Sequence, residues 1–316
     1  MDVVSDVLAS MHVRGTVRCG AELAAPWGFS VPATPGVAPF YVIERGGCYL
    51  EIRGQHEMVA LAGGDIVMIT HGAAHSLRDS KRARAVPMEE LIEHGACGGI
   101  HPVVRHGGDG VVTKIVHGTF TYPRTPMHPL IEAMPPMLHL PANDSCVGPW
   151  TETTLRFIAS ETNRGTPGSA LVVSHLTDVL FIQLVRASMA RHAASGEDCN
   201  SNILRALADP DISRALTAIH REINRAWTVA DLAREAGMSR TAFATRFTSL
   251  AGMPPLAYAT RWRMVKASEF LARGEGTIAE VAERVGYESE AAFSKAFKRE
   301  MGTAPGTWRR AHAWNP

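Results

Sequence analysis

The sequence predicts an α+β multidomain protein in which a β-rich region, a helical hairpin and an all-helical region follow one another. Three observations support this fold class. Glycines divide residues 40–79 into short apolar runs, which is typical of a small antiparallel barrel or sandwich. Helical periodicity begins near residue 150, and two segments near the C-terminus repeat each other. We place the domains at 1–145, 146–204 and 205–316.

Length and composition indicate a folded protein of about two domains. Of its 316 residues, 46% are hydrophobic and 20% are charged, a balance typical of globular chains. No apolar run approaches the roughly 20 residues that a membrane helix needs, and the acidic start, MDVVSDVLAS, lacks the basic region of a signal peptide. The five cysteines are scattered and form no CxxC, which argues against disulfides and structural zinc. We therefore expect a cytoplasmic protein without a membrane segment.

The middle of the chain predicts a helical hairpin. Residues 151–163 and 169–192 carry apolar side chains at helical spacing, separated by the turn RGTPG. The second helix is very apolar, so it either packs on the barrel or forms a subunit interface. Because it is more apolar than one packed face requires, we expect part of it, including Leu180, to lie in a homodimer interface. Its expected apolar stripe comprises Leu171, Leu176, Leu180 and Leu184. Residues 193–202 form the predicted linker.

Positive charge is concentrated at the C-terminal end of the chain. From residue 206 onward there are 16 Lys and Arg against 12 Asp and Glu, whereas the whole chain has a net charge of only +1. A basic C-terminal region joined to a mildly acidic remainder suits a nucleic-acid-binding module beside a domain that does not bind nucleic acid.

Two C-terminal segments are copies of one helical unit. Residues 227–247 and 277–297 align at an offset of 49, which becomes 50 after one extra residue in the turn. In each copy a threonine begins a capping box, an alanine permits close helix crossing, a glycine ends the first helix and a serine caps the second. These residues are Thr228, Ala233, Gly237 and Ser239 in the first copy and Thr277, Ala282, Gly286 and Ser289 in the second.

This order of features predicts a helix-turn-helix, whose second helix enters the major groove of DNA. A bundle of paired helical hairpins is the alternative, and it gives no reason for the same caps at the same places. The helix predicted over 255–273, with Leu256, Met264, Ala267 and Leu271 on its inner face, joins the two units. Its length of about 27 Å is near the roughly 34 Å between successive major-groove openings, so one chain could bind two adjacent turns of double-stranded DNA.

Helical geometry predicts which side chains face the DNA. Two phenylalanines in each second helix must face the core, which leaves the opposite face for bases and phosphates. The expected DNA-facing residues are Arg240, Thr241, Ala244, Thr245 and Thr248 in the first unit, and Glu290, Ala291, Ser294, Lys295 and Lys298 in the second.

Four motifs in the C-terminal third together resemble the AraC family of transcriptional regulators. They are GMPPLAY at 252–258, RWRM at 261–264, AEVAERVGYESEAAFSKAFKR at 279–299 and GTAPGTWR at 302–309. The first two thirds of the chain resemble the cupin sensor domain of such regulators. The resemblance implies a ligand-responsive, sequence-specific DNA-binding regulator, usually an activator, that is not an enzyme.

A cupin barrel also raises the alternative of a metal enzyme fused to a DNA-binding region. GDIVMITHGAAH at 64–75 resembles the second cupin motif, with Thr70 where proline is usual, but the strand PFYVIERGG carries Tyr41 and no histidine pair. One histidine cannot build a site of three protein ligands, so we expect His75 in a turn or in the core and no metal or other cofactor. His94, His101, His106 and His117 share no metal-ligand spacing.

The segment RGTVR places Arg14 and Arg18 four residues apart, just before the predicted barrel. This pair resembles the RxxxR motif by which PilZ domains, and a class of cupin-bearing AraC-like regulators, hold cyclic di-GMP. The resemblance implies cyclic di-GMP as the effector and exopolysaccharide genes as targets. Guanidinium groups on a flexible arm could bind its phosphates and guanine edges.

Two further hypotheses concern the same segment. The RxxxR spacing occurs at two other places in the chain, so the two arginines could simply be solvated side chains on an edge strand. A redox sensor is the other possibility, in which the neighbouring Arg18 lowers the pKa of the Cys19 thiol. The segment NDSCVG at 143–148 matches a second PilZ pattern but follows the predicted strands, and we interpret that match as coincidence.

Overall fold

The computed structural model describes residues 3–11, 13–97, 103–122, 131, 134–142, 153–154, 157–158, 160–161, 166–195 and 203–312. The chain divides into two compact units. A β-rich unit combines Val13–Tyr122 with Pro135–Arg191, and a helical unit combines Met1–His12, Pro123–Met134 and His192–Pro316. The N-terminal segment therefore belongs with the C-terminal helices. The boundaries expected from the sequence place it in the first domain, 1–145.

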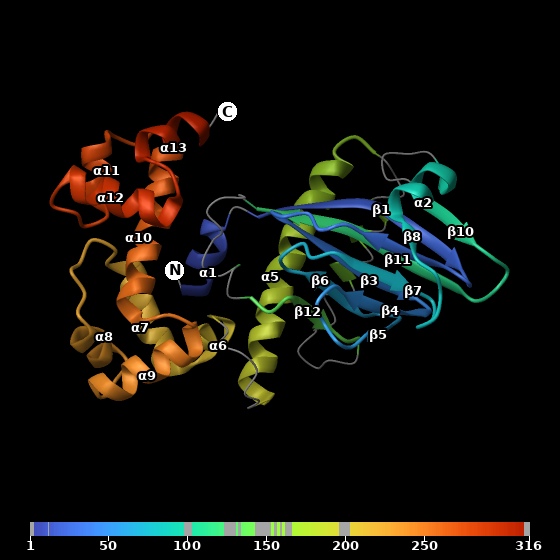
Figure 1. The fold of residues 1–316 in the computed structure, drawn as a ribbon, viewed down its shortest axis with the longest axis horizontal. Coiled ribbons are helices and arrows are strands. Elements are labelled where there is room, and N and C mark those ends of the chain that lie inside the picture. Colours follow the sequence, from blue (N-terminus) through green and yellow to red (C-terminus); the bar gives the residue numbers. More distant parts are fainter. Residues whose placement is uncertain are drawn as a thin grey trace. The chain divides into compact units, whose positions relative to one another are not determined.

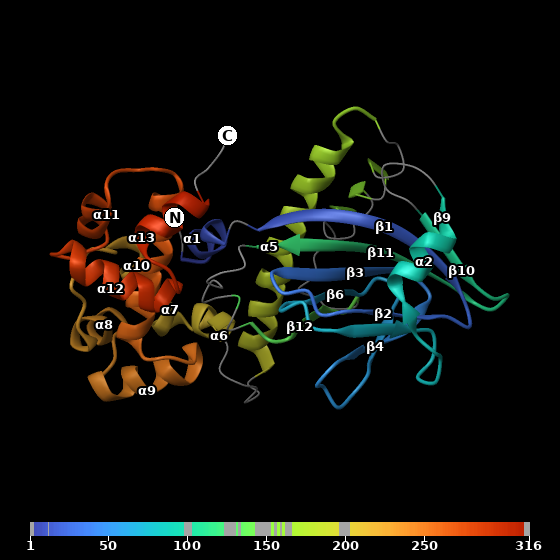
Figure 2. The same ribbon diagram turned by 45° about the horizontal axis from the view of Figure 1, so that its top comes forward.

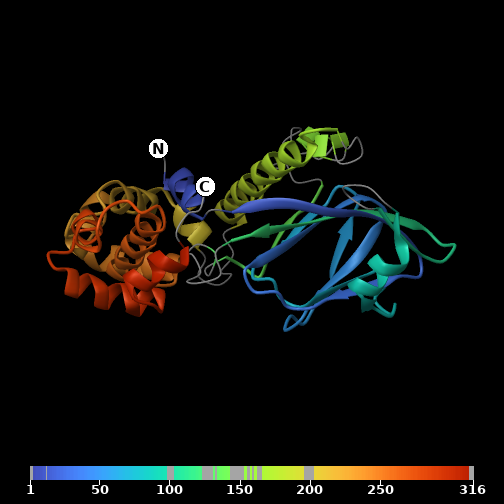
Figure 3. The ribbon, with the colours of Figure 1, turned by 90° about the horizontal axis from the view of Figure 1, so that it is seen from above.

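The β-rich unit contains two facing sheets (Figure 3). The seven-stranded sheet has the order β12-β6-β3-β11-β1-β10-β9, and the five-stranded sheet has the order β5-β4-β7-β2-β8. The strands are β1 (Arg14–Ala24), β2 (Gly28–Val31), β3 (Val37–Arg45), β4 (Gly47–Ile52), β5 (Val59–Ala62), β6 (Ile66–Ile69), β7 (His75–Arg78), β8 (Val86–Pro87), β9 (Ala96–Cys97), β10 (Val103–Gly107), β11 (Val112–Thr121) and β12 (Met137–Leu140). Apolar side chains from both sheets form one core, to which Tyr41, Ile43 and Leu50 contribute. The predicted β-rich N-terminal fold is confirmed.

Helix α5 (Ser169–Ser195) packs on the outer face of the seven-stranded sheet (Figure 2). The ring of Phe181 lies 5.1 Å from that of Phe120 on β11. Asp178 accepts a hydrogen bond from the Gly15 amide at 2.7 Å, and Ser174 donates one to the Gly15 carbonyl at 3.1 Å. A Cβ at Gly15 would lie 2.6 Å from the Cβ of Thr177. Glycine at this position therefore lets the helix approach the strand closely.

Two expectations about α5 were wrong. Leu180 and Leu184 are buried, whereas the exposed apolar side chains are Leu171, Val172, Val179 and Ile182. Contrary to the expectation about apolar run length, Ser169–Ala190 has a mean hydropathy of 1.5 and is long and apolar enough to cross a membrane by length and composition. A core helix of a soluble protein meets the same criterion. Of the first helix of the predicted hairpin, only residues 153–154, 157–158 and 160–161 are described, and these are helical. The NDSCVG segment and most of the predicted linker lie outside the described residues.

The helical unit contains α1 at its N-terminal end and two helix-turn-helix units joined by α10 (Figure 1). Its helices are α1 (Val3–Ser10), α6 (Ile203–Ala208), α7 (Pro210–Arg221), α8 (Val229–Glu235), α9 (Arg240–Ala251), α10 (Pro255–Ala272), α11 (Ile278–Arg284), α12 (Glu290–Met301) and α13 (Pro305–His312). On α10, Met264, Ala267 and Leu271 are buried as predicted, but Leu256 is exposed.

Candidate DNA-binding surface and effector site

Each helix-turn-helix owes its shape to local hydrogen bonds. Thr228 and Asp231 form a complete capping box at the start of α8, as Thr277 and Glu280 do at the start of α11. Ser239 and Ser289 then cap α9 and α12 by accepting hydrogen bonds from backbone amides three residues later. These caps are the ones that the sequence predicts.

The glycine turns between the paired helices adopt the left-handed conformation. Gly237 has φ +69° and Gly286 has φ +82°, values that a residue with a Cβ adopts only at a cost. The turn directs α9 away from α8, and α12 away from α11, so each second helix presents a free face.

The buried phenylalanines fix that face. Phe243 and Phe247 on α9, and Phe293 and Phe297 on α12, are fully buried. All the predicted DNA-facing residues lie outside this core: Ala244 and Ser294 are partly buried, and Arg240, Thr241, Thr245, Thr248, Glu290, Ala291, Lys295 and Lys298 are exposed.

Ion pairing separates the cations of these helices into two groups. Arg246 on α9 binds Asp209, and Arg299 on α12 binds its neighbour Glu300 at 2.8 Å. Within the described part of the chain, Arg240, Lys295 and Lys298 have no carboxylate partner. A free cation can bind a phosphate or a guanine edge without first breaking an ion pair, so these three side chains are the strongest candidates for DNA contact.

Arg14 and Arg18 lie within the first strand of the β-rich unit. Arg14 pairs with Thr121 of β11, and a bulge between Val17 and Cys19 leaves Arg18 outside the regular register. The Arg18 Nε donates to Thr119 Oγ1 at 3.3 Å. Both arginines are exposed. Thr119 and Thr121 are two residues apart and therefore lie on the same face of β11. Arg18 and Arg14, their partners, lie on that face as well. The expectation of a flexible arm ahead of the barrel is therefore wrong.

A small cavity lies between the two sheets and is closed on one side by α2 (Met88–Gly95). Its volume of about 20 Å³ is room for about one water molecule. It is lined by Cys19, Ala21, Leu23, Phe29, Tyr41, Met88, Leu91, Ile92, Val104, Ile115 and His117. This cavity therefore has no space for a dinucleotide.

Tyr41 and His75 form a hydrogen-bonded pair in this interior. His75 is buried, and its Nδ1 lies 2.8 Å from the Ala73 carbonyl while its Nε2 lies 2.7 Å from the Tyr41 hydroxyl. A neutral ring that donates from Nδ1 and accepts at Nε2 satisfies both contacts. Burial lowers the pKa of His75, and burial also lowers the pKa of His117 to about 4. His75 is thus a core residue, one of the two predicted positions, and its ring is neutral.

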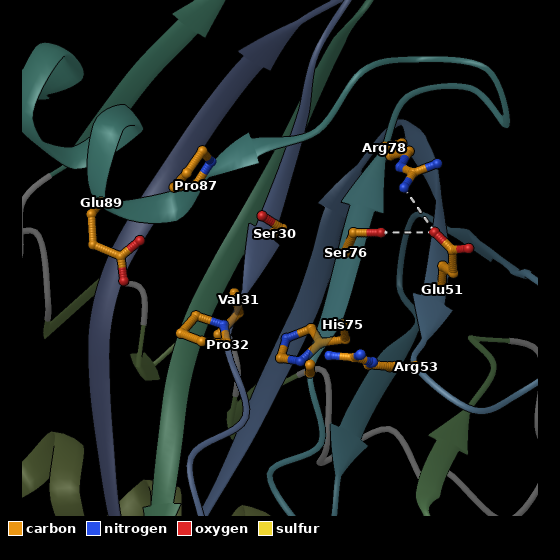
Figure 4. Close-up of a pocket in the computed structure, with 11 residues that line it drawn as sticks. Ser30, Val31, Pro32, Glu51, Arg53, His75, Ser76, Arg78, Pro87 and Glu89 are labelled. Atoms are coloured by element: carbon orange, nitrogen blue, oxygen red, sulfur yellow. Dashed lines mark hydrogen bonds and ion pairs between the residues drawn. The ribbon is translucent and has the colours of Figure 1, made fainter.

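A larger cleft of about 550 Å³ opens on the five-stranded sheet (Figure 4). Glu51 accepts hydrogen bonds there from Ser76 and Arg78, while Arg53 and Glu89 also line it. Neither cavity is lined by Arg14 or Arg18. No group of three or more His, Cys, Asp and Glu side chains among the described residues could hold a metal ion.

The prediction that Arg18 lowers the pKa of the Cys19 thiol is wrong. Cys19 is buried, and burial raises its pKa to about 11 instead of Arg18 lowering it. A thiol with this pKa is almost entirely protonated at neutral pH and is a poor nucleophile.

Sequence reasoning missed one polar cluster. Asp6 on α1 contacts His220 on α7, and His220 contacts Tyr258 on α10. Nothing in the sequence pattern links Asp6 to His220, because they are separated by 214 positions.

Two capped helix-turn-helix units on one helical scaffold, in a chain that also contains a β-rich N-terminal unit, define the class of DNA-binding regulators. A family model described as "Cupin" matches residues 2–190, and one described as "Helix-turn-helix domain" matches residues 232–311. An AraC-like transcription regulator of Streptomyces lividans is 34% identical over 315 residues, which covers 98% of both chains. The chain belongs to the AraC-like family of transcriptional regulators with an N-terminal cupin domain, and it is a regulator and not an enzyme.

The chain is also similar to two other regulators and, in its C-terminal third, to one solved structure. The transcriptional regulator AlkR of Acinetobacter baylyi is 32% identical over 98% of this chain and 99% of its own length. The RCS-specific activator RclR of Escherichia coli is 28% identical over 98% of this chain and 97% of its own length. The DNA-binding domain of AdpA, solved in complex with a target DNA, is 33% identical over 33% of this chain and 92% of that chain, with a TM-score of 0.30.

Proposed function

We propose that this protein is a cytoplasmic, ligand-responsive activator that binds double-stranded DNA through α9 and α12. The observation that carries the proposal is the set of unpaired cations, Arg240, Lys295 and Lys298, on the outer faces of two capped helices. Helix α10 has 18 residues and is therefore about 27 Å long. That length suits docking of the two units in successive major grooves.

The first prediction tests Lys295. If Lys295 binds a base edge, Lys295→Ala weakens binding to the operator by about 1–3 kcal/mol and relaxes specificity at one position. If it binds a phosphate, the loss is the same for operator and random duplexes. An electrophoretic titration on both duplexes measures the difference, with Lys81→Ala in the β-rich unit as the matched control. Unchanged affinity for both duplexes would exclude Lys295 from the DNA-binding surface.

We propose cyclic di-GMP as the effector, bound by Arg14 and Arg18 at exposed positions of β1, and exopolysaccharide genes as the regulated targets. Two guanidinium groups on one face can bind phosphates in bidentate fashion and stack on guanine. Charge-assisted hydrogen bonds contribute about 1.5–3 kcal/mol each. Two such contacts approach the several kcal/mol needed to shift a protein from mostly inactive to mostly active.

The second prediction follows from this site. Calorimetry of the native protein with cyclic di-GMP should show binding, with cyclic AMP and GTP as control ligands. Replacing Arg14 and Arg18 together by alanine should abolish the heat of binding and leave the fold intact. The variant with lysine at both positions should also lose most of the binding, because an ammonium group cannot form a planar bidentate contact. Unchanged affinity in the alanine variant, or no heat with the native protein, would make RGTVR an ordinary exposed strand.

We also propose that the regulator is a homodimer that associates through the exposed face of α5. Leu171, Val172, Val179 and Ile182 give this face apolar side chains, and apolar surface of this kind is typical of interaction sites.

A further inference from the structure

The first helix of the chain is part of the helical unit that contains both helix-turn-helix units. Helix α1 packs against α7 and α10 (Figure 1). Val3, Val7 and Met11 are buried in this contact region of the unit. The DNA-binding unit is therefore built from both ends of the sequence.

Asp6 is the polar centre of this contact. Its Oδ2 lies 3.0 Å from His220 Nδ1 on α7, and its Oδ1 lies 3.5 Å from Lys266 Nζ on α10. The other ring nitrogen of His220 lies 2.9 Å from the Tyr258 hydroxyl. The side chain of His220 is only 3% exposed, and its ring stacks on Trp262 at 3.7 Å. A neutral ring that donates to Asp6 and accepts from Tyr258 satisfies every contact.

The two contacts of Asp6 lead to the two helix-turn-helix units. Tyr258, reached through His220, packs edge-on against Phe247 of α9. Lys266 lies in the part of α10 whose buried neighbours, Met264 and Ala267, form a core with Phe293 of α12. One carboxylate on α1 therefore joins the side of the unit that supports α9 to the helix that supports α12.

We propose that Asp6 is a positioning residue for DNA binding: by bridging α7 and α10, it fixes the orientation of α9 relative to α12. Asp6 contacts no DNA and acts through His220 and Lys266. The inference rests on the proposed docking of both helix-turn-helix units in successive grooves. Its consequence is that the N-terminal helix contributes to the affinity gained by binding two grooves at once, and not to the affinity of either unit alone.

The test uses the full-length protein and two duplexes. The operator is selected from a random library with the wild-type protein, and a shortened duplex retains only one groove site. We expect Asp6→Asn, which keeps the size and an acceptor oxygen but removes the charge, to weaken binding to the long duplex about tenfold and to leave binding to the short duplex unchanged. Ala9→Asn, which places the same amide at an exposed position of α1, serves as the matched control and should bind both duplexes as the wild type does.

A second variant separates positioning from general destabilisation. His220→Gln should lose the same long-duplex preference, and the double variant with Asp6→Asn should lose no more than either single variant, because the two side chains act as one bridge. Circular dichroism should show native helix content for all variants.

A pH titration adds a readout specific to this cluster. The charged and titratable groups that face His220 are Asp6 from α1 and Tyr258 and Lys266 from α10. Burial lowers the pKa of His220 more than Asp6 raises it. The stability that the neutral ring contributes is thus complete above its ordinary pKa of 6.5 and is lost as the pH falls through the lower folded value. The free energy of unfolding of the wild type should therefore decrease on acidification, and that of His220→Gln should decrease less.

Three results would overturn the inference. Asp6→Asn with an unchanged preference for the long duplex would remove the positioning role alone. An equal loss on both duplexes would mean that Asp6 only stabilises the fold. A wild-type protein with no preference for the long duplex would overturn the two-groove docking itself, and the role of Asp6 with it.

Discussion

At the scale of single residues, burial and not the charge of the neighbouring residue determines the reactivity of the Cys19 thiol. Cys19 follows Arg18 in the chain, yet its side chain lies on the inner side of the barrel, where no solvent stabilises a thiolate. Arg18 is exposed although Cys19, the next residue, is buried. Sequence proximity to a cation therefore does not produce a reactive thiol here.

The third prediction follows from that environment. Burial raises the pKa of the Cys19 thiol to about 11 and that of the Cys48 thiol to about 12, so both should resist alkylation by iodoacetamide in the native protein at pH 7.5. Mass spectrometry of the native protein and of the urea-unfolded protein, used as the reactive control, measures the protection. Rapid modification of Cys19 in the native state would restore the redox hypothesis.

At the scale of elements, two separate effects favour glycine at the ends of helices in the helical unit: a positive φ and the close approach of another backbone. The positive φ of Gly237, Gly286 and Gly302 disfavours any residue with a Cβ. Only Gly286 also approaches another backbone, since a Cβ there would lie 2.9 Å from the Cα of Asn224. At Gly237 the nearest atom is the flexible end of Arg214 at 3.3 Å, and at Gly302 nothing lies within 4 Å.

The fourth prediction ranks alanine substitutions at these glycines. Gly302→Ala measures the cost of the left-handed backbone alone, about 1–2 kcal/mol of unfolding free energy, and Gly237→Ala should cost about the same. Gly286→Ala should cost clearly more, because the Asn224 backbone must move. Urea unfolding of the full-length protein, followed by circular dichroism of the helices, gives the order. Equal losses of unfolding free energy for Gly286→Ala and Gly302→Ala would show that the Asn224 backbone moves at little energetic cost.

At the scale of the whole molecule, α5 has two apolar faces, one buried and one exposed. The face with Leu180, Phe181 and Leu184 is buried on the seven-stranded sheet, whereas Val179 and Ile182 are each 37% exposed. A second copy of the chain would cover the exposed face in the proposed homodimer. The same two-sided apolarity explains why α5 meets a composition criterion for membrane helices.

The fifth prediction separates these faces. The double variant Val179→Glu with Ile182→Glu should be monomeric in light scattering and keep a native circular dichroism spectrum, because its charges replace only exposed side chains. Leu180→Glu, the buried control on the same helix, should instead destabilise the β-rich unit, since it places a carboxylate in an apolar core. A double variant that stays dimeric would place the interface on another surface.

The sequence by itself determined the helix-turn-helix units. Their capping boxes, glycine turns and phenylalanine faces depend on residues within a few positions of one another, so a repeated local pattern was enough to place them, and Arg240 and Lys295 with them. The turn or core position of His75 also followed from the sequence, because the strand PFYVIERGG lacks the histidine pair of a metal-binding cupin.

Only the tertiary structure decided which distant segments meet. The contact of Asp6 with His220, the burial of Leu180 against the sheet instead of at a surface, and the inward direction of Cys19 each depend on packing between elements far apart in the chain. Periodicity shows that a helix has an apolar face, but it does not show which neighbour covers that face. Burial and long-range pairing are properties of the assembled core, and the local pattern does not contain them.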